Sequence, residues 1–231
     1  MTLIGKLLYG LKNAVSPNLC PVCGKHLVEG EEALCIGCEA ELPRILLNGA
    51  SCPDIEDLFV GSKIVDKAVS MFAYSRTSVY SALLKDIKYH NRASLAQFLG
   101  QQFARELKAL GYFEEMDVIV PVPLHYTKLD IRGYNQSRQI ALGLSMESGL
   151  PVNDAVIALQ PHATQTFRTI EERHKNVKGV FSAKEDIGNY NVVLVDDVIT
   201  TGATLIACCD ALQSVGVKKV NVLSLAFASS H

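Results

Sequence analysis

The sequence has no tryptophan, few aromatic residues and no excess of positive charge. Phenylalanine and tyrosine together make up 7% of the 231 residues, and the formal net charge is −2. Proteins hold single-stranded nucleic acid with aromatic platforms and basic grooves, and both are scarce here. The composition therefore does not favour a protein built mainly to bind nucleic acid, although a local basic patch remains open.

Long hydrophobic runs are also missing. No apolar stretch approaches the roughly 20 residues that a membrane-spanning helix needs, so we expect no membrane span. Residues 1–15 place Leu3, Leu7 and Leu11 at helical spacing, which predicts a short helix packed on the protein body. A helix that lies on a membrane surface or binds a partner is the alternative. Interrupting glycines and the lack of a small-residue cleavage site argue against a signal peptide.

Two common nucleotide-binding loops do not occur in the sequence. Neither Gly-x-x-x-x-Gly-Lys nor Gly-x-Gly-x-x-Gly is present. The first would cradle the phosphates of a nucleoside triphosphate, and the second the pyrophosphate of a dinucleotide. P-loop enzymes and dinucleotide-dependent oxidoreductases are therefore excluded as interpretations.

Seven cysteines are present, and four of them form two Cys-x-x-Cys pairs: Cys20, Cys23, Cys35 and Cys38. An odd count without a secretory signal argues against a disulfide framework and predicts a reducing, cytoplasmic location. Two such pairs bring four sulfur atoms to the corners of a tetrahedron, the geometry that structural zinc takes in proteins. We therefore predict a closed structural zinc site, with a redox-active Cys-x-x-Cys as the rival interpretation.

The segment around these cysteines is short and polar. Residues 24–34 suit a β-ribbon between the two pairs, and the small apolar content of residues 18–42 implies that the metal supplies the folding free energy. Residues 39–63 form a connector rich in turn-forming residues. We place the domain boundary near residue 60, so residues 1–60 hold the N-terminal helix, the zinc ribbon and the connector.

Residues 61–231 show strands alternating with helices. This order predicts an α/β fold with a mostly parallel sheet and helices on both faces. In such sheets, ligands bind beyond the carboxyl ends of the strands. The expected strands are 69–74, 117–123, 192–195 and 220–227, and the expected helices are 78–88, 94–110, 140–146 and 203–214.

The stretch 192–204 carries the clearest chemistry. Four apolar residues are followed by Asp196 and Asp197, whose ionised carboxylates only accept hydrogen bonds and so suit the paired hydroxyls of a ribose. A loop then leads directly into a helix, where exposed N–H groups and the helix dipole favour an anion such as a 5′-phosphate. The loop residues are Thr200, Thr201, Gly202, Ala203 and Thr204. A threonine-capped helix without a ligand is the plainer alternative.

This stretch resembles the phosphoribosyl pyrophosphate signature of type I phosphoribosyltransferases. The strand, the acid pair and Thr-x-Gly follow one another in the same order as in that signature. Further motifs along the chain add to the resemblance. Those motifs are Ile87-Lys88-Tyr89, Pro121-Val122-Pro123-Leu124-His125, Arg132-Gly133-Tyr134-Asn135-Gln136 and Arg173-His174-Lys175-Asn176-Val177. Together with the four-cysteine ribbon, this order resembles the ComF family of competence-associated, phosphoribosyltransferase-like proteins. The stretch Leu159-Gln160-Pro161-His162 departs from the family pattern, which often has basic residues there.

The resemblance implies a cytoplasmic protein that binds phosphoribosyl pyrophosphate with Mg²⁺ and is linked to DNA uptake. Asp196 and Asp197 would hold the ribose diol and, with Arg132, serve the catalytic site. The pyrophosphate side would be formed by Lys88, Pro121, Val122, Pro123, Arg132 and Arg173. For the three basic residues, a solvated surface charge is the alternative.

Two functions are compatible with these motifs. The first is an enzyme that transfers phosphoribose to an unidentified nitrogen nucleophile as pyrophosphate leaves, through a cationic sugar ring. The second is a non-catalytic module that binds phosphoribosyl pyrophosphate or a nucleotide, while its zinc ribbon docks on a competence-machinery protein or on single-stranded DNA. Release of pyrophosphate distinguishes the two.

Overall fold

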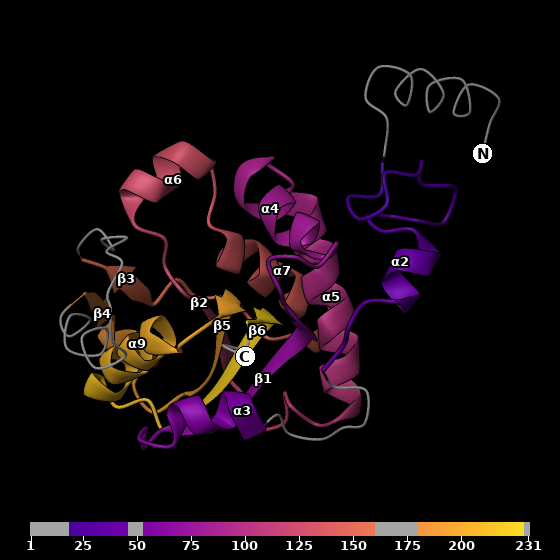
Figure 1. Cartoon of the computed structure of the whole chain (residues 1–231). Helices are drawn as coiled ribbons and strands as arrows, with labels where there is room; N and C mark the ends of the chain where they lie inside the picture. The colour runs from indigo at the N-terminus through magenta and orange to yellow at the C-terminus, as the bar shows by residue number, and fades with distance from the viewer. Residues whose placement is uncertain (1–18, 46–52, 160–179, 229–231) are drawn as a thin grey trace.

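The computed structural model describes residues 19–45, 53–159 and 180–228 (Figure 1). These segments contain the two cysteine pairs, the acid pair and the loop after it. The helix expected in residues 1–15, the thiol of Cys52 and the basic segment around Arg173 lie outside the described residues.

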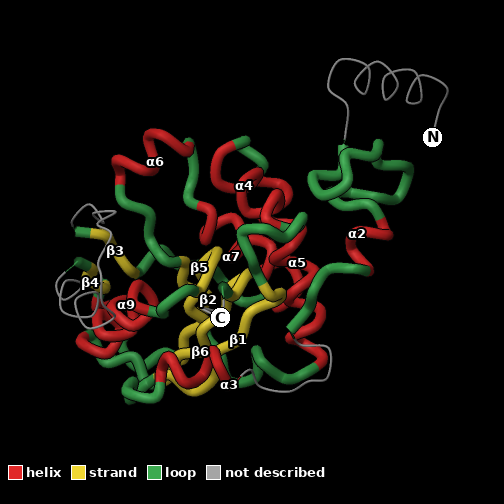
Figure 2. The backbone as a smooth tube through the Cα atoms, in the orientation of Figure 1, coloured by secondary structure: helices red, strands yellow, loops and turns green. Residues whose placement is uncertain are grey.

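A parallel sheet forms the centre of the molecule (Figure 2). The strand order is β1-β6-β5-β2, and all three neighbouring pairs run parallel, which confirms the predicted sheet. The central strand β5 is an uninterrupted apolar run from Val192 to Val195 because both of its faces are covered. The strands are β1 (Val65–Ala73), β2 (Val118–Pro121), β5 (Asn191–Ile199) and β6 (Lys219–Phe227).

Helices cover both faces of this sheet, as predicted (Figure 1). Alternate residues of β5 enter two separate cores: Val193 and Val195 join one, and Val192 and Leu194 join the other. The first core is covered by α4 (Ser81–Tyr89), α5 (Ala93–Ala109) and α7 (Gln136–Ser148). The second is covered by α3 (Pro53–Glu56), η1 (Asp57–Phe59) and α9 (Ala203–Ser214).

The remaining elements lie at the edges. A two-stranded antiparallel sheet pairs β3 with β4, and it was not expected from the sequence. The helix α6 was not expected either. These elements are α2 (Ile36–Ala40), α6 (Tyr126–Arg132), β3 (Val156–Ala158), β4 (Phe181–Ala183) and η2 (Glu185–Ile187).

Several element boundaries differ from the expected ones for local reasons. The helix expected at 203–214 has those bounds in α9. The helix expected at 140–146 begins earlier, at Gln136, because the side chain of Asn135 accepts a hydrogen bond from the Arg138 N–H and caps it. Residues 24–34 form turns and an isolated bridge between Leu19 and His26 in place of a longer ribbon.

The cysteine segment is packed into the main body. Leu27, Leu34 and Leu42 are buried in the same core as α4 and α5. Arg44 forms a bridge to the strand residue Phe72 and donates from Nε to a carboxylate oxygen of Glu106 at 2.6 Å. The apolar core is thus continuous across residue 60, and the domain boundary placed there stays a prediction.

Two glycines allow α5 and α7 to pack closely. A Cβ atom on Gly143 would lie 2.1 Å from the carbonyl oxygen of Gln97, and one on Gly100 would lie 2.4 Å from the carbonyl oxygen of Ile140. Both contacts are to backbone atoms, which cannot rotate away. The two helices can hold their spacing only if both positions lack a side chain.

We expect Gly143→Ala to lower the free energy of unfolding by about 2 kcal/mol, because the helices must separate to admit the methyl group. Urea denaturation measures this change. Gly61→Ala is the matched control, since nothing lies within 4 Å of its added Cβ, and it should change stability by less than about 0.5 kcal/mol. Equal effects of the two substitutions would contradict this account of the helix crossing.

Candidate functional site

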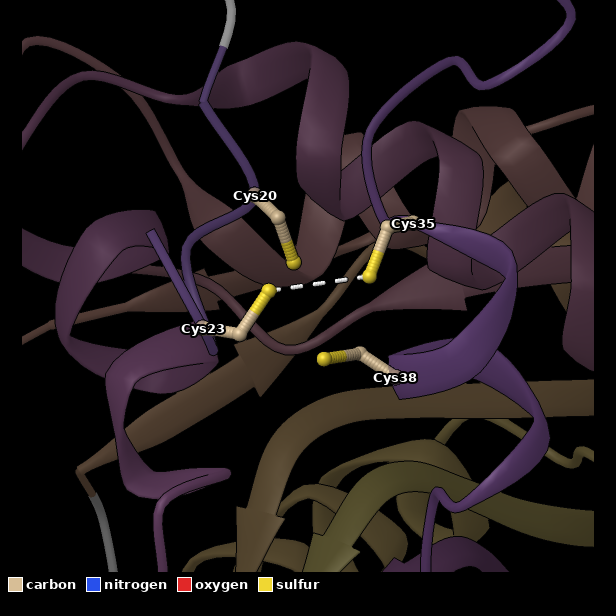
Figure 3. A group of neighbouring side chains, drawn as sticks. All are labelled: Cys20, Cys23, Cys35 and Cys38. Carbon is tan, nitrogen blue, oxygen red and sulfur yellow. Dashed lines mark hydrogen bonds between the residues drawn. The ribbon is translucent and has the colours of Figure 1, made fainter. Parts of the chain in front are cut away.

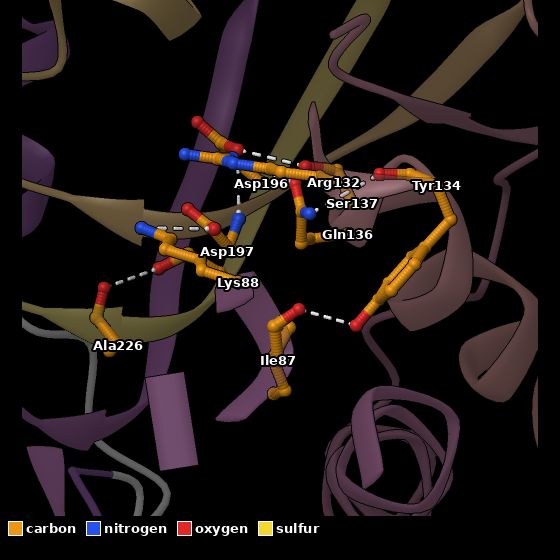
Figure 4. A network of polar contacts seen from close by, with 10 residues as sticks. Ile87, Lys88, Arg132, Tyr134, Gln136, Ser137, Asp196, Asp197 and Ala226 are labelled. Atoms are coloured by element: carbon orange, nitrogen blue, oxygen red, sulfur yellow. Dashed lines mark hydrogen bonds and ion pairs between the residues drawn. The ribbon is translucent and has the colours of Figure 1, made fainter. Parts of the chain in front are cut away.

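The acid pair lies at the carboxyl end of β5 (Figure 4). The Oδ1 atom of Asp196 accepts a hydrogen bond from the N–H of Asp197 at 2.8 Å and another from the hydroxyl of Ser137 at 2.9 Å. Ser137 belongs to the first turn of α7. The strand and the helix thus hold the Asp196 carboxylate in one orientation, with its second oxygen available to a ligand.

The environment of Asp196 disfavours its negative charge. Part of the residue stays accessible to solvent. Burial of the carboxylate is nevertheless the main cause that raises its pKa from 3.8 to about 7, and the neighbouring charge of Asp197 adds to the effect. The two hydrogen bonds and the charge of Lys88 act in the opposite direction. A positively charged or hydroxyl-bearing ligand would relieve this burial cost.

Lys88 contacts the second carboxylate directly. Its ammonium lies 3.1 Å from Oδ2 of Asp197, and both side chains are largely buried. Lys88 belongs to the last turn of α4, so this helix delivers a cation to the edge of the sheet. The sequence-predicted residues Lys88, Asp196 and Asp197 are therefore brought together.

Arg132 is the last residue of α6 and belongs to the same polar network as the acid pair (Figure 4). Its guanidinium donates to the side-chain oxygen of Gln136 at 2.9 Å and stands 5.7 Å from the ring centroid of Tyr89. The neighbouring Tyr134 donates its hydroxyl proton to the carbonyl oxygen of Ile87. These contacts join α4, α6 and α7 around Asp196 and Asp197.

Tyr134 is a neutral hydrogen-bond donor here. Burial raises the pKa of its hydroxyl to about 12, and the carboxylate of Asp197 contributes to the rise while Arg132 opposes it. Its hydrogen bond to the backbone of α4 fixes the start of α7 next to the residue that precedes Lys88. Tyr134 therefore positions the site rather than ionising in it.

The Pro121-Val122-Pro123 loop borders the acid pair. Pro121 on β2 pairs with Val195 on β5, so the loop begins beside Asp196. The N–H of Val122 donates to the carbonyl of Val195 at 2.8 Å, and the carbonyl of Val122 accepts from the side chain of Asn135 at 3.0 Å. The loop is thereby held against both β5 and the start of α7.

The loop after Asp197 presents backbone donors. Gly202 has a φ of +71°, which favours glycine, and it packs against Leu58 and Phe59 of η1. The Ile206 N–H donates to the Gly202 carbonyl at 2.9 Å. No described group accepts a hydrogen bond from the N–H groups of residues 200–204. Within the described residues, the N–H groups of Thr200, Thr201, Gly202, Ala203 and Thr204 are therefore unpaired, as a backbone anion site requires.

Sequence reasoning missed several members of this site, and one predicted residue cannot be placed. Arg173 lies outside the described residues. Ser137 and Lys128 had not been singled out, and Tyr134 had been noted only as part of a motif. Lys128 stands four residues before Arg132, a spacing that puts two cations on one helical face, and this was the available signal.

The four cysteines of the N-terminal segment converge (Figure 3). Their Sγ atoms all lie within 4.8 Å of one another, and those of Cys23 and Cys35 are 3.6 Å apart. Four sulfur atoms at 2.3 Å from a tetrahedral zinc ion would be about 3.8 Å apart, so the cluster fits that metal. All four positions are filled by thiols, which is the ligand set of a structural site.

This cluster is linked to α4 at two places. The hydroxyl of Tyr80, which precedes α4, donates to the carbonyl of Cys38 at 3.1 Å. Arg92, which follows α4, donates to the carbonyl of Leu19 at 3.3 Å and lies 3.4 Å from a carboxylate oxygen of Asp86. The cysteine segment therefore contacts both ends of the helix that supplies Lys88.

Comparison with known proteins matches this chain to a family model described as the phosphoribosyl transferase domain, over residues 98–230. The match takes in more than half of the sequence and contains both the acid pair and the loop that follows it. The chain belongs to the phosphoribosyl transferase domain family.

Curated relatives of this phosphoribosyl transferase domain protein confirm the resemblance to the ComF family. Competence protein F of Haemophilus influenzae is 27% identical over 223 residues, which span 90% of this chain and 96% of the relative. The DNA utilization protein YhgH of Escherichia coli K12 is 26% identical over 219 residues, with the same coverage of both chains. Each match therefore takes in nearly the whole of both proteins.

A solved structure of glutamine phosphoribosylpyrophosphate amidotransferase from B. subtilis aligns with 61% of this chain, at 24% identity and a TM-score of 0.43. The alignment covers 30% of that larger chain, and the family assignment does not rest on it. In the described part of the phosphoribosyl transferase domain protein, no helix has the length and apolar content to cross a membrane.

We expect the protein purified with a zinc supply to carry one zinc ion per chain. Cys23→Ser should lose this zinc and lower the melting temperature by at least about 5 °C, because the segment loses a closed ligand set. Metal analysis and thermal denaturation measure both effects. As a control, zinc is removed from the wild type with a chelator and then returned. Recovery of the melting temperature shows that the treatment did not damage the protein. A zinc-free but fully stable wild-type protein would contradict the assignment.

The raised pKa of Asp196 predicts a pH dependence of stability. The folded state holds this proton up to about pH 7 and the unfolded state loses it near 3.8, so stability falls as pH rises between these values. From about pH 5 to about pH 8, the wild type should lose about 2 kcal/mol more unfolding free energy than Asp196→Asn. Urea denaturation measures this, with Asp210→Asn on the exposed side of α9 as control. Parallel pH profiles for wild type and Asp196→Asn would rule out the shift.

Proposed function

We propose that this protein binds phosphoribosyl pyrophosphate with Mg²⁺ at the carboxyl edge of its sheet. The observation that carries this proposal is the direct succession of an acid pair and a loop of five open N–H groups, 200–204, at the end of β5. Few ligands need both an acid pair and a phosphate-binding loop in immediate succession. A ribose 5-phosphate moiety offers a diol for the carboxylates and a phosphate for the loop.

Each part of the ligand has a counterpart among the residues. Asp196 and Asp197 would accept hydrogen bonds from the ribose 2′ and 3′ hydroxyls. The loop that holds Thr200, Thr201, Gly202, Ala203 and Thr204 would bind the 5′-phosphate. The pyrophosphate would lie toward Lys88, Arg132 and the backbone of Pro121, Val122 and Pro123, with Arg173 as a further predicted contact.

Binding requires Lys88 to change partner. Its ammonium lies 3.1 Å from Oδ2 of Asp197, an atom to which a ribose hydroxyl would donate. When the diol takes this position, the ammonium is free to contact the pyrophosphate oxygens a short distance away.

The acid pair also fits a bound Mg²⁺. Two carboxylates are the hard oxygen donors that this ion prefers, and ligand phosphates normally complete its coordination. Mg²⁺ held there by ligand oxygens beside Asp196 and Asp197 would neutralise charge on the leaving pyrophosphate. The cations of Lys88 and Arg132 act on the same leaving group from the protein side.

Transfer to a nitrogen nucleophile is the reaction that this arrangement supports. The bond between ribose C1 and the pyrophosphate oxygen breaks with its electron pair leaving on pyrophosphate, while the nitrogen lone pair forms the new bond to C1. Positive charge develops on the sugar ring, which the two carboxylates stabilise. The site supplies positioning and charge.

The names of the relatives support a cellular setting. One is called a competence protein and another a DNA utilization protein. We infer from this that the protein works in the cytoplasm in connection with the uptake or use of DNA. The zinc-binding cysteine segment would then be the contact for a competence-machinery protein or for single-stranded DNA.

Calorimetric titration with phosphoribosyl pyrophosphate and Mg²⁺ tests the proposal. Zinc-loaded wild type should bind, and the double variant Asp196→Asn, Asp197→Asn should lose at least about 100-fold in affinity, since two ligand-facing carboxylates are removed. The control Asp210→Asn removes an exposed acid from α9 and should bind as the wild type does. No binding by folded wild type would refute the proposal.

An acceptor screen scored by pyrophosphate release then separates the two functions. Release that depends on a nitrogen compound and on Asp196 identifies a transferase. Tight binding without release, across nucleobases and amines, favours the non-catalytic module.

A further inference from the structure

The helix α6 faces the site with its charged side. None of its seven residues is buried, and Lys128 and Arg132 are the two that are partly buried. Its apolar residues point outward: Tyr126 is 66% exposed and Ile131 is 82% exposed. A surface helix normally turns its apolar stripe to the protein and its charges to water. In α6, the acid Asp130 is exposed as expected, but the two cations are partly buried while Tyr126 and Ile131 are exposed.

The two inward cations differ in their contacts. Arg132 is held by the side-chain oxygen of Gln136 and the ring of Tyr89. The ammonium of Lys128 has no hydrogen bond or ion pair with any described residue. Burial lowers the pKa of Lys128, and the nearby charges of Arg132 and Lys88 lower it further, against a smaller opposing effect of Asp197 and Asp196. These effects place it in a cluster of like charge.

The local charge is unbalanced as a result. Three cations, Lys88, Lys128 and Arg132, face two carboxylates, and Lys88 already takes up the charge of Asp197. Burial also raises the pKa of Asp196, which disfavours its negative charge. Half-buried cations beside other cations cost free energy unless an anion joins them. The surplus of positive charge therefore indicates a site for a multiply charged anion between α6 and α4.

The position of the surplus positive charge indicates which part of the ligand it would bind, the 5′-phosphate or the group at C1. The loop 200–204 packs through Gly202 on Leu58 and Phe59, which belong to the core on one face of the sheet. Lys88 and Ser137 reach the acid pair from helices on the other face. The acid pair thus lies between the open loop and the cations. A ribose seated on it would direct its 5′-phosphate to the loop and its C1 substituent toward α6.

We propose that Lys128 recognises the diphosphate group at C1 of the ligand, and that it makes the site prefer phosphoribosyl pyrophosphate to ribose 5-phosphate. This inference rests on the proposed function. Lys128 and Arg132 stand one helical turn apart, so they contact the same group from one face. The inward turn of α6 and the exposure of its apolar residues are then explained by the ligand.

The test compares three ligands by calorimetry in the zinc-loaded full chain with Mg²⁺: phosphoribosyl pyrophosphate, ribose 5-phosphate and inorganic pyrophosphate. Lys128→Met keeps the length of the side chain and removes its charge. It should weaken phosphoribosyl pyrophosphate and pyrophosphate about tenfold or more, the effect of one charge-assisted hydrogen bond, and change ribose 5-phosphate less than about twofold. Lys128→Arg should restore binding to within about threefold of wild type.

Lys218→Met is the matched control, because this exposed lysine precedes β6 at the opposite end of the strands and should alter none of the affinities. Equal losses for phosphoribosyl pyrophosphate and ribose 5-phosphate in Lys128→Met, or no loss for either, would overturn the inference. Wild type that binds pyrophosphate through Lys128 but not phosphoribosyl pyrophosphate would end the proposed function and leave the diphosphate site standing. Binding of neither would end both.

Discussion

Two adjacent carboxylates at the end of a buried strand are the constraint around which this structure is arranged. β5 is apolar from Val192 to Val195, and the next two side chains are acidic. Partial burial raises the pKa of Asp196, so the pair is unfavourable unless other groups compensate. Ser137 and Lys88 supply that compensation from α7 and α4, and the Pro121–Pro123 loop fixes the neighbouring strand. A fold without a polar ligand would gain stability by replacing these acids with apolar residues.

The central part of this arrangement could be predicted from the sequence because it is local. A continuous apolar run, an acid pair, a glycine with positive φ and a following helix are all encoded within residues 192–214, and the helix bounds were correct. The parallel sheet and its covering helices were predictable from the same alternation along the chain. Cys20, Cys23, Cys35 and Cys38 converge as their spacing predicted.

The rest could not be predicted because it depends on contacts distant in sequence or on patterns that break the usual rule. Ser137 reaches Asp196 across 59 positions, and Tyr134 reaches Ile87 across 47. α6 escaped notice because its cations face inward, which inverts the amphipathic pattern that identifies a surface helix. The shared core of Leu27, Leu34 and Leu42 with α4 and α5 was not predicted either. Sequence spacing gives no information on which core such residues enter.

That shared core gives the cysteine segment a role in the geometry of the site. α4 is held at its start by Tyr80 on the Cys38 carbonyl and near its end by Arg92, which links Asp86 to the Leu19 carbonyl. Lys88 lies two residues after Asp86, and the Tyr134 hydrogen bond to Ile87 lies between them. A displacement of about 1 Å at this end of α4 would break the 3.1 Å ion pair to Asp197, because such contacts weaken steeply with distance. The four-cysteine cluster and the Lys88 cation are therefore linked through one helix, α4. The described residues of the cysteine segment supply no side chain to the acid pair, yet they help to fix the position of the cation that contacts Asp197.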